Sequence, residues 1–167
     1  MKKLTAERLR EILHYDEETG IFTWKIIVGY RTHVGDVAGS KTRQGYIRIG
    51  LMGNLYRAHR LAWLYVFGKD PVNQIDHINL NKSDNRIANI REVTNQQNAQ
   101  NQYEAQKNNK SSGLRGVSLR NRDGKWRAQI KINGTLKHLG YFDTKEDAHS
   151  EYRAMKVKLH PFFSAAI

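Results

Sequence analysis

Hydrophobic side chains recur along this chain with two spacings, and each spacing predicts a different backbone structure. Apolar residues repeat every three or four positions in stretches that predict helices: residues 5–13, 59–67 and 144–159. Short apolar or alternating runs between turn residues predict strands: residues 21–24, 46–49, 55–56, 74–76, 89–93, 115–119, 125–132 and 135–142. The mixture of the two patterns predicts an α+β fold.

Turn and capping residues mark where several of these elements begin and end. Thr5 is placed to cap the first helix, and residues 94–97 carry the Thr-x-x-Gln spacing that caps a helix start. Residues 15–20 (YDEETG) are typical of a turn, and Gly53-Asn54 and Asn133-Gly134 are typical of tight hairpins. We therefore expect a hairpin around each of these two pairs.

A polar stretch divides the chain. Residues 107–112 (KNNKSS) are too polar to pack and predict a flexible linker. After it, residues 113–167 predict a three-stranded antiparallel sheet with one helix, which leaves the other sheet face open and basic. Before it, we expect a central domain over residues 58–106 and an N-terminal α/β region over residues 1–57.

The charge of the chain favours a polyanionic partner. The 167 residues carry a formal net charge of +12, from 28 Lys and Arg against 16 Asp and Glu, with a pI near 10.0. Lys and Arg at this density replace the counterions of phosphate groups on nucleic acids. A basic ribosomal protein or a membrane-surface protein would share the bias, so charge alone does not select a function.

Two features of the sequence bear on where the protein acts and how it is held together. It has no run of about 18 apolar residues, and its first residues, MKKLTAERLREIL, are charged and helical rather than signal-like. We therefore expect a cytoplasmic protein with no membrane partner. The chain has no Cys, which excludes disulfides and four-cysteine zinc sites, so its fold is expected to depend on packing.

Candidate chemistry is concentrated in residues 74–98 (QIDHINLNKSDNRIANIREVTNQQN), where a carboxylate stands beside an imidazole at Asp76-His77. Asn89 follows His77 by twelve positions, and Asn98 follows Asn89 by nine. The expected order of strand, long polar loop, strand and helix resembles the ββα-metal motif of the HNH nuclease family, in its phage-type members. The preceding residues 58–68 (AHRLAWLYVFG) are similar to the same members.

The resemblance implies a role for each of the four residues. Asp76 and Asn98 would hold one divalent cation per active site, Mg²⁺ or Mn²⁺, because these ions take carboxylate and amide oxygens. His77 would be the general base, since a neutral imidazole accepts a proton from water at physiological pH. Asn89 would be the second catalytic residue, tying the hairpin together and helping to orient the base; a simple turn residue is the alternative.

Basic side chains near this segment are candidates to contact phosphate. They are Arg60, Lys82, Arg86 and Arg91. For each of them a solvated surface position is the open alternative. His59 begins the predicted helix beside Arg60, and we expect it to have a structural or supporting role rather than to touch phosphate.

A second resemblance covers the part after the linker. The segments Arg115-Gly-Val, Lys125-Trp-Arg-Ala and His138-Leu-Gly-Tyr-Phe, with the helix over residues 146–152, are similar to the ethylene-response-factor (APETALA-two) DNA-binding domain. This implies that the sheet lies in the major groove of DNA and that five side chains reach bases or phosphates: Arg115, Arg127, Gln129, Lys131 and His138. His138 stands where that family often has Trp, and Ser118 where it often has a basic residue, so base specificity is not carried over. A solvated sheet face is the alternative.

Together these patterns predict a phage-type HNH endonuclease, similar to free-standing homing enzymes, that uses a divalent metal to hydrolyse phosphodiester bonds of double-stranded DNA. Residues 58–106 would be the nuclease domain and residues 113–167 the domain that reads DNA, while residues 1–57 would support the nuclease or contact DNA. We expect a monomer that nicks one strand, with a dimer left open, acting in the host cytoplasm if a phage encodes it. The main alternative is a sequence-specific DNA-binding regulator that does not cleave. RNA binding has less support, because the strands carry no RNP-type aromatic motif.

Overall fold

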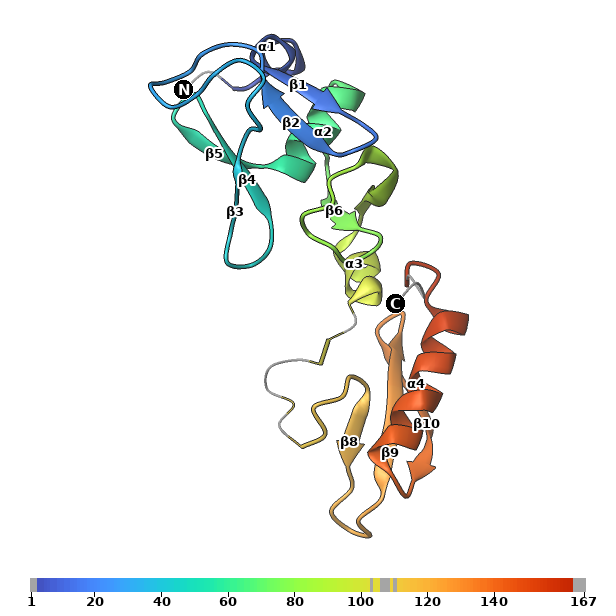
Figure 1. The fold of residues 1–167 in the computed structure, drawn as a ribbon. Coiled ribbons are helices and arrows are strands. Elements are labelled where there is room, and N and C mark those ends of the chain that lie inside the picture. Colours follow the sequence, from blue (N-terminus) through green and yellow to red (C-terminus); the bar gives the residue numbers. More distant parts are fainter. Residues whose placement is uncertain (1–2, 103, 106–108, 110, 164–167) are drawn as a thin grey trace. The chain divides into compact units, whose positions relative to one another are not determined.

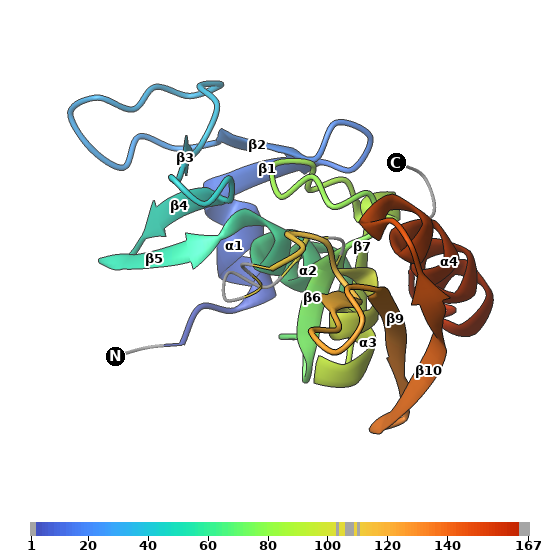
Figure 2. The same ribbon diagram turned by 90° about the horizontal axis from the view of Figure 1, so that it is seen from below.

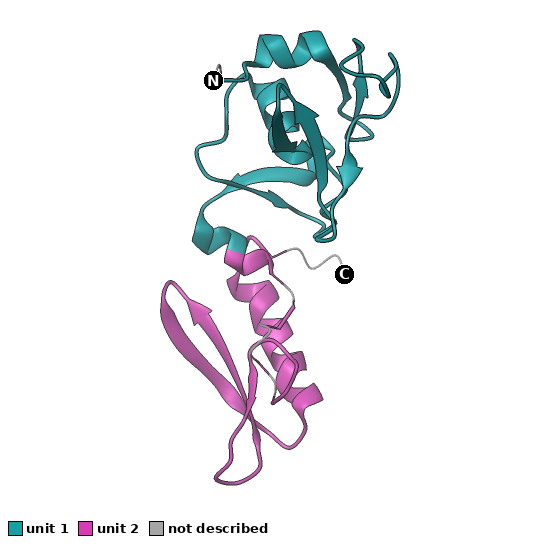
Figure 3. Cartoon of the chain, turned by 90° about the vertical axis from the view of Figure 1, so that its left-hand side faces the viewer, with its two compact units in different colours: residues 1–98 teal, residues 99–167 magenta. Residues whose placement is uncertain are grey.

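The computed structural model describes residues 3–102, 104–105, 109 and 111–163, in two compact units, residues 1–98 and 99–167 (Figures 1 and 3). These described residues form four α-helices and four small antiparallel sheets, so the protein is mixed α and β as its hydrophobic pattern predicts. Part of the predicted linker lies outside the described residues, and the boundary between the units falls earlier, at Asn98. In the described part of the chain no helix has the length and apolar character needed to cross a membrane.

The first unit begins with a capped helix, α1 (Ala6–Ile12). The hydroxyl of Thr5 accepts a hydrogen bond from the backbone N–H of Arg8 at 3.2 Å, which confirms the predicted cap. Leu9 and Ile12 are buried, so the apolar side of the helix faces the core.

A hairpin follows the helix directly. β1 (Leu13–Asp16) pairs with β2 (Ile21–Trp24) in an antiparallel ladder. The prediction that Leu13 belongs to the helix was wrong, because Leu13 begins β1. Of the predicted turn, residues 15–20, the first two belong to β1 and residues 17–20 form the turn. Pairing with β2 holds this segment in an extended backbone, which overrides the helical spacing of its apolar residues.

The next segment forms a small sheet and a helix. β3 (Ser40–Lys41) pairs with β4 (Ile47–Leu51), which pairs in turn with β5 (Asn54–Arg57). The predicted hairpin is confirmed, with its turn one position earlier than expected. The helix α2 (Ala58–Phe67) follows and ends at Gly68, whose φ of 71° is the left-handed conformation that glycine adopts at helix ends.

Two short strands come next. β6 (Gln74–His77) pairs with β7 (Ile90–Val93) in an antiparallel ladder. The loop between them ends in a short 3-10 helix, Ile87–Asn89, so Asn89 lies just before the second strand rather than inside it.

The helix α3 (Asn95–Asn101) follows β7 and begins with the predicted capping box. The N–H of Thr94 donates to Oε1 of Gln97 at 2.8 Å, and the N–H of Gln97 donates to Oγ1 of Thr94 at 3.3 Å. The two bonds satisfy backbone N–H groups that would otherwise have no partner at the start of a helix. They therefore mark the point at which β7 ends and α3 begins.

One hydrophobic core holds the first unit together. It takes side chains from α1, β1, β2, β4 and α2, and it reaches Ile90 of β7, with Ile75 of β6 packed against it. Figure 2 shows α1 and α2 beside the β4–β5 hairpin. The N-terminal 57 residues therefore share a core with the strands that carry Asp76 and His77.

The second unit is one sheet with one helix. β8 (Val117–Leu119), β9 (Trp126–Ile132) and β10 (Thr135–Phe142) are antiparallel in the order β10-β9-β8. The helix α4 (Lys145–Leu159) packs on one face, where its Ala148 joins a small core (Figure 1). β9, β10 and α4 lie where the sequence predicts them, whereas β8 begins at Val117, two positions later than predicted.

Candidate active site

The end of β6 carries two chemically different side chains on opposite faces of the strand. Asp76 and His77 are neighbours, and successive side chains of a strand point to opposite sides. Both are buried, with 7% and 5% of their surfaces exposed. The carboxylate and the imidazole therefore have separate surroundings, although they belong to adjacent residues.

Residues of β7 and α3 lie on the side of Asp76. Arg91, opposite Asp76 in the ladder, donates to carboxylate Oδ2 from Nη2 at 3.0 Å and from Nε at 3.1 Å. Gln74 lies two positions before Asp76, and therefore on the same face of β6. Its Oε1 accepts a hydrogen bond from Nδ2 of Asn98 on α3. The structure thus brings Asp76 and Asn98 to one side of the strand.

The donors on this side have the chemistry of a hard divalent cation site. Mg²⁺ usually keeps several waters and takes only one or two carboxylates from the protein, so two oxygen ligands are enough where phosphate also binds. Asn98 directs its amide N–H toward Gln74, which leaves Oδ1 as its donor for a cation. Among the described side chains, no group of three or more His, Cys, Asp and Glu could hold a metal ion. The assignment of Asp76 and Asn98 as ligands stays a prediction.

The side of His77 is packed against other rings. The ring of His59, in the first turn of α2, stands edge-on to that of His77, with centroids 5.0 Å apart and an interplanar angle of 87°. Tyr46, just before β4, lies against both rings, with its centroid 5.5 Å from His59 and 6.1 Å from His77. These contacts restrict how the His77 ring can turn.

His59 is itself a buried neutral imidazole. Its pKa is lowered to about 3, first by burial, then by electrostatic interaction with the nearby His77 ring, and then by the positive charges of Arg57 and Arg60. Its Nδ1 is buried and has no hydrogen-bond partner in the part of the chain that the structure describes. The contact between His59 and His77 is thus one of packing.

Asn85, in the loop between β6 and β7, is a second neighbour of His77. Nε2 of His77 lies 3.2 Å from Oδ1 of Asn85, and Nδ2 of Asn85 donates to the carbonyl of Ser83 at 3.1 Å. Burial lowers the pKa of His77, while the Asn85 hydrogen bond and the charge of Asp76 act in the opposite direction. The ring is therefore neutral at pH 7 and able to accept a proton. Sequence reasoning missed Asn85, which stands among polar loop residues typical of a solvated turn.

Asn89 holds the same loop together. Its Oδ1 accepts from the backbone N–H of Asn79 at 3.0 Å, and its Nδ2 donates to the carbonyl of Asp84 at 2.8 Å. The carboxylate of Asp84 binds Arg86, whose guanidinium lowers the pKa of Asp84 to about 2. Asn89 thus fixes the backbone immediately before Asn85.

Two exposed cations lie near the His77 side of the strand. Nζ of Lys82 lies 5.3 Å from the centroid of the Tyr46 ring, and the guanidinium carbon of Arg57 lies 4.3 Å from it. Because Tyr46 also contacts His77, both cations are close to the candidate base. Lys82 is among the predicted phosphate contacts, whereas Arg57, the last residue of β5, is a further candidate that the sequence did not indicate.

The other predicted phosphate contacts of the first unit are engaged within the protein. Arg86 binds Asp84 and Arg91 binds Asp76. Arg60 donates to the carbonyl of Pro71 at 3.4 Å.

The open face of the sheet in the second unit gathers polar and basic side chains. In β9, Ala128 and Ile130 are buried, so the side chains between and beside them point away from that core. The strand register places His138 of β10 opposite Gln129. Four of the predicted DNA contacts therefore share the open face: Arg127, Gln129, Lys131 and His138.

Arg115, the fifth predicted contact of this unit, has different neighbours. Its guanidinium donates to Oε1 of Gln102 at 3.2 Å and to the carbonyls of Glu104 at 3.0 Å and Ala99 at 3.4 Å. It also bonds to the side chain of Tyr152 on α4. In this position Arg115 holds together α3, which contains Ala99, and the segment that follows it, which contains Gln102 and Glu104.

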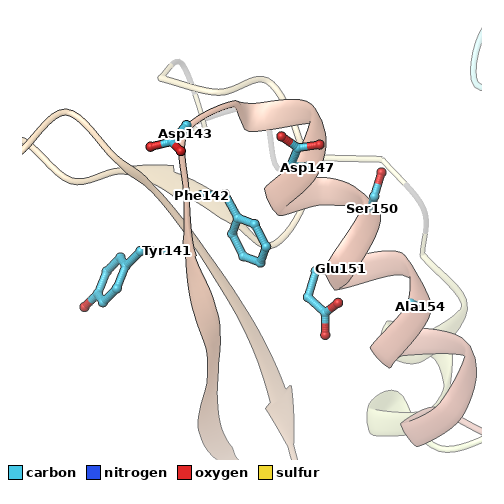
Figure 4. A pocket seen from close by; sticks show the side chains of 7 residues that line it. All are labelled: Tyr141, Phe142, Asp143, Asp147, Ser150, Glu151 and Ala154. Atoms are coloured by element: carbon cyan, nitrogen blue, oxygen red, sulfur yellow. The ribbon is translucent and has the colours of Figure 1, made fainter.

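A hollow with acidic walls lies between β10 and α4 (Figure 4). Asp143, Asp147 and Glu151 line it, and Figure 4 shows Phe142 pointing toward the helix and Tyr141 pointing to the other side of the strand. Carboxylates repel phosphate, so this side of the second unit is unsuited to nucleic acid. The basic open face is the better candidate for that contact.

Comparison with known proteins bears on what this arrangement does. A family model described as HNH endonuclease matches residues 56–100, which include all four residues of the predicted motif. An uncharacterized HNH endonuclease of Acanthamoeba polyphaga mimivirus is 30% identical over 144 residues, which are 85% of this chain and 69% of that relative. No solved structure matches the chain.

Proposed function

The chain belongs to the HNH endonuclease family, and from that premise we propose that it is a metal-dependent nuclease acting on double-stranded DNA. One observation carries the proposal. A buried neutral imidazole, His77, and a carboxylate, Asp76, occupy the two faces of one strand end. A phosphate at that end of β6 would have a base on one side and a cation site on the other.

His77 acts as the base in this proposal. Its ring takes a proton from water, whose oxygen bonds to phosphorus while the bond to the 3′-oxygen breaks. Once the leaving oxygen gains a proton, the products are a 5′-phosphate and a 3′-hydroxyl. The rings of His59 and Tyr46 keep the imidazole in one orientation, which reduces the entropy lost on reaching the transition state.

Asp76 and Asn98 would hold the divalent cation, Mg²⁺ or Mn²⁺, on the other side of the strand. When bound there, the cation neutralises the scissile phosphate and stabilises the leaving oxygen. Arg91 holds the Asp76 carboxylate in place through Oδ2 and adds a positive charge beside it. Lys82 and Arg57 would bind a neighbouring phosphate on the side of the base.

In the same proposal the second unit docks on DNA through the open face of its sheet. The support is chemical: Arg127, Gln129, Lys131 and His138 share that face, whereas the hollow beside α4 is acidic. Polar side chains on a sheet can reach base edges in the major groove, so this face would read part of the target site. The resemblance to the ethylene-response-factor domain stays a prediction.

We propose that one candidate site per chain makes a monomer that nicks one strand, while a dimer would bring two sites together. The viral origin of the relative favours a viral enzyme that acts in the cytoplasm of its host cell.

Incubation of supercoiled plasmid carrying a candidate target with Mg²⁺, Mn²⁺ or EDTA tests the proposal. We expect nicked circles with either metal and intact plasmid with EDTA. Linear product would point to paired sites. Tight, salt-sensitive binding without cleavage in any metal would contradict the nuclease assignment and favour the non-cleaving regulator.

A further inference from the structure

We infer that Asn85, held in place by the β1–β2 hairpin, sets the tautomer of His77 and thereby selects which ring nitrogen accepts the proton. This rests on the proposed function, in which His77 is the base. It gives Asn85 a positioning role outside the four residues of the nuclease motif, and it gives the N-terminal hairpin a task in the active site.

The orientation of the Asn85 amide follows from its own hydrogen bond. A carbonyl only accepts, so the group of Asn85 that lies 3.1 Å from the carbonyl of Ser83 is the amide nitrogen. The other end of the amide, Oδ1, then lies 3.2 Å from Nε2 of His77. An amide oxygen also only accepts, so Nε2 must carry the hydrogen.

The position of that hydrogen decides the chemistry of the ring. A neutral imidazole has one N–H, and with the hydrogen on Nε2 the lone pair is on Nδ1. In the opposite tautomer two lone pairs, of Nε2 and of Asn85 Oδ1, would face each other. Asn85 is only 2% exposed, so water cannot relieve that repulsion. His77 is therefore held with Nδ1 as its basic nitrogen.

The β1–β2 hairpin fixes the backbone that carries Asn85. The hydroxyl of Tyr15 donates to the carbonyl of Asn85 at 2.7 Å, across 70 positions of sequence. Gly20, in the turn of the hairpin, has φ of +72°, and a Cβ there would lie 2.4 Å from the backbone nitrogen of Arg86. Only glycine permits this close approach. The hairpin thus packs directly against the loop at Asn85, the residue that contacts His77.

The tautomer can be measured directly in the intact wild-type protein. We would record long-range ¹H–¹⁵N correlations of histidine-labelled protein at pH 8 and assign His77 by comparison with His77→Ala. Protonated and unprotonated ring nitrogens are well separated in such spectra, and only Nε2 couples to both ring C–H protons. We expect His77 as the Nε2–H form. An Nδ1–H form, or a mixture, would overturn the inference.

A variant links the tautomer to the rate. Asn85→Leu removes the acceptor at similar volume, so we expect a mixture of tautomers and cleavage slowed by about 10- to 100-fold, with Mn²⁺ affinity unchanged. Asn54→Leu, the same change at an exposed position, is the control. A wild-type tautomer and rate in Asn85→Leu would overturn the inference, and if this variant does not fold, the wild-type spectrum decides alone. Failure of the wild type to cleave would overturn the nuclease proposal instead, since the spectrum does not depend on cleavage.

Discussion

The two units of this protein place the polar side chains proposed to act in catalysis and in DNA binding in opposite environments. The first unit buries the proposed base and the polar residues around it: His59, Asp76, His77, Asn85 and Asn89 are each at most 7% exposed. The second unit leaves Arg127, Gln129, Lys131 and His138 on the uncovered face of its sheet.

The difference follows from the different requirements of catalysis and of DNA binding. A base works only if its protonation, tautomer and orientation are set in advance, which burial and hydrogen bonds achieve. Docking on DNA needs cations that can reach phosphates and exchange counterions, which requires exposure. Changes in the first unit should therefore act on the rate and change little with salt, whereas changes in the second should act on binding and depend strongly on salt.

The largest expected effect is that of Asp76→Ala. Removal of the carboxylate deletes one of the two proposed metal ligands, so metal-dependent nicking of plasmid should fall below detection. DNA binding in EDTA should persist, because the sheet of the second unit is unchanged. Asp143→Ala, which removes an exposed carboxylate of the second unit, should cleave normally. Normal cleavage by Asp76→Ala would refute its role as a ligand.

The double variant Arg127→Ala with Lys131→Ala tests whether the open sheet face of the second unit binds DNA. Loss of two phosphate contacts should lower the slope of log affinity against log salt by about two, and weaken binding roughly tenfold at moderate salt. Fluorescence anisotropy across a salt series measures both quantities. The matched control is Lys145→Ala with Lys158→Ala, which removes the same charge from α4. If both pairs change the slope equally, the sheet is not the docking face.

Tyr15→Phe tests the hairpin that supports Asn85. The variant leaves the buried carbonyl of Asn85 without the hydroxyl that it accepts from, which should lower the free energy of unfolding by about 1–3 kcal/mol. Cleavage should slow severalfold, with the salt dependence of binding unchanged. Urea denaturation and single-turnover cleavage provide the two measurements, with the exposed Tyr30→Phe as control. Full stability in Tyr15→Phe would mean that the bond does not hold the loop.

The last prediction concerns pH, and no effect on cleavage at neutral pH is expected from it. His59 has a folded pKa of about 3, below the value of about 6.5 in an unfolded chain, so the unfolded state binds the extra proton as pH falls. The stability that depends on its neutral form is complete above pH 6.5 and declines between pH 6.5 and 3, by at most about 1.4 kcal/mol per pH unit. Replacement of His59 by Phe should flatten this acid limb in denaturation curves recorded at several pH values. Identical limbs in the two proteins would contradict a buried neutral His59.

Local patterns were enough to predict most of the elements around the site. The Thr94–Gln97 spacing and the hydrophobic runs on either side placed the strand, loop, strand and helix, and both capping bonds are present. The alternation in residues 125–132 likewise predicted which side chains share a face. These features depend on residues a few positions apart, so they can be recognised in a sequence.

The parts that sequence reasoning missed depend on distant contacts. Leu13 fits the apolar spacing of the first helix, and only its pairing with Trp24 makes it a strand residue. Asn85 acquires its role from a ring eight positions earlier and from Tyr15, 70 positions earlier. Such a role leaves no local pattern, because any polar loop could contain the same Asn.

The central claim is that a buried imidazole at the end of β6 is the base of a DNA nuclease. Its most direct test is the single-turnover rate at which His77→Ala nicks supercoiled plasmid with Mg²⁺, beside the wild type and His14→Ala, which changes an exposed histidine of the same unit. A general base contributes about 10²- to 10⁴-fold, so we predict a loss of at least about a hundredfold in His77→Ala and a normal rate in His14→Ala. A His77→Ala protein that nicks at the wild-type rate would contradict the account.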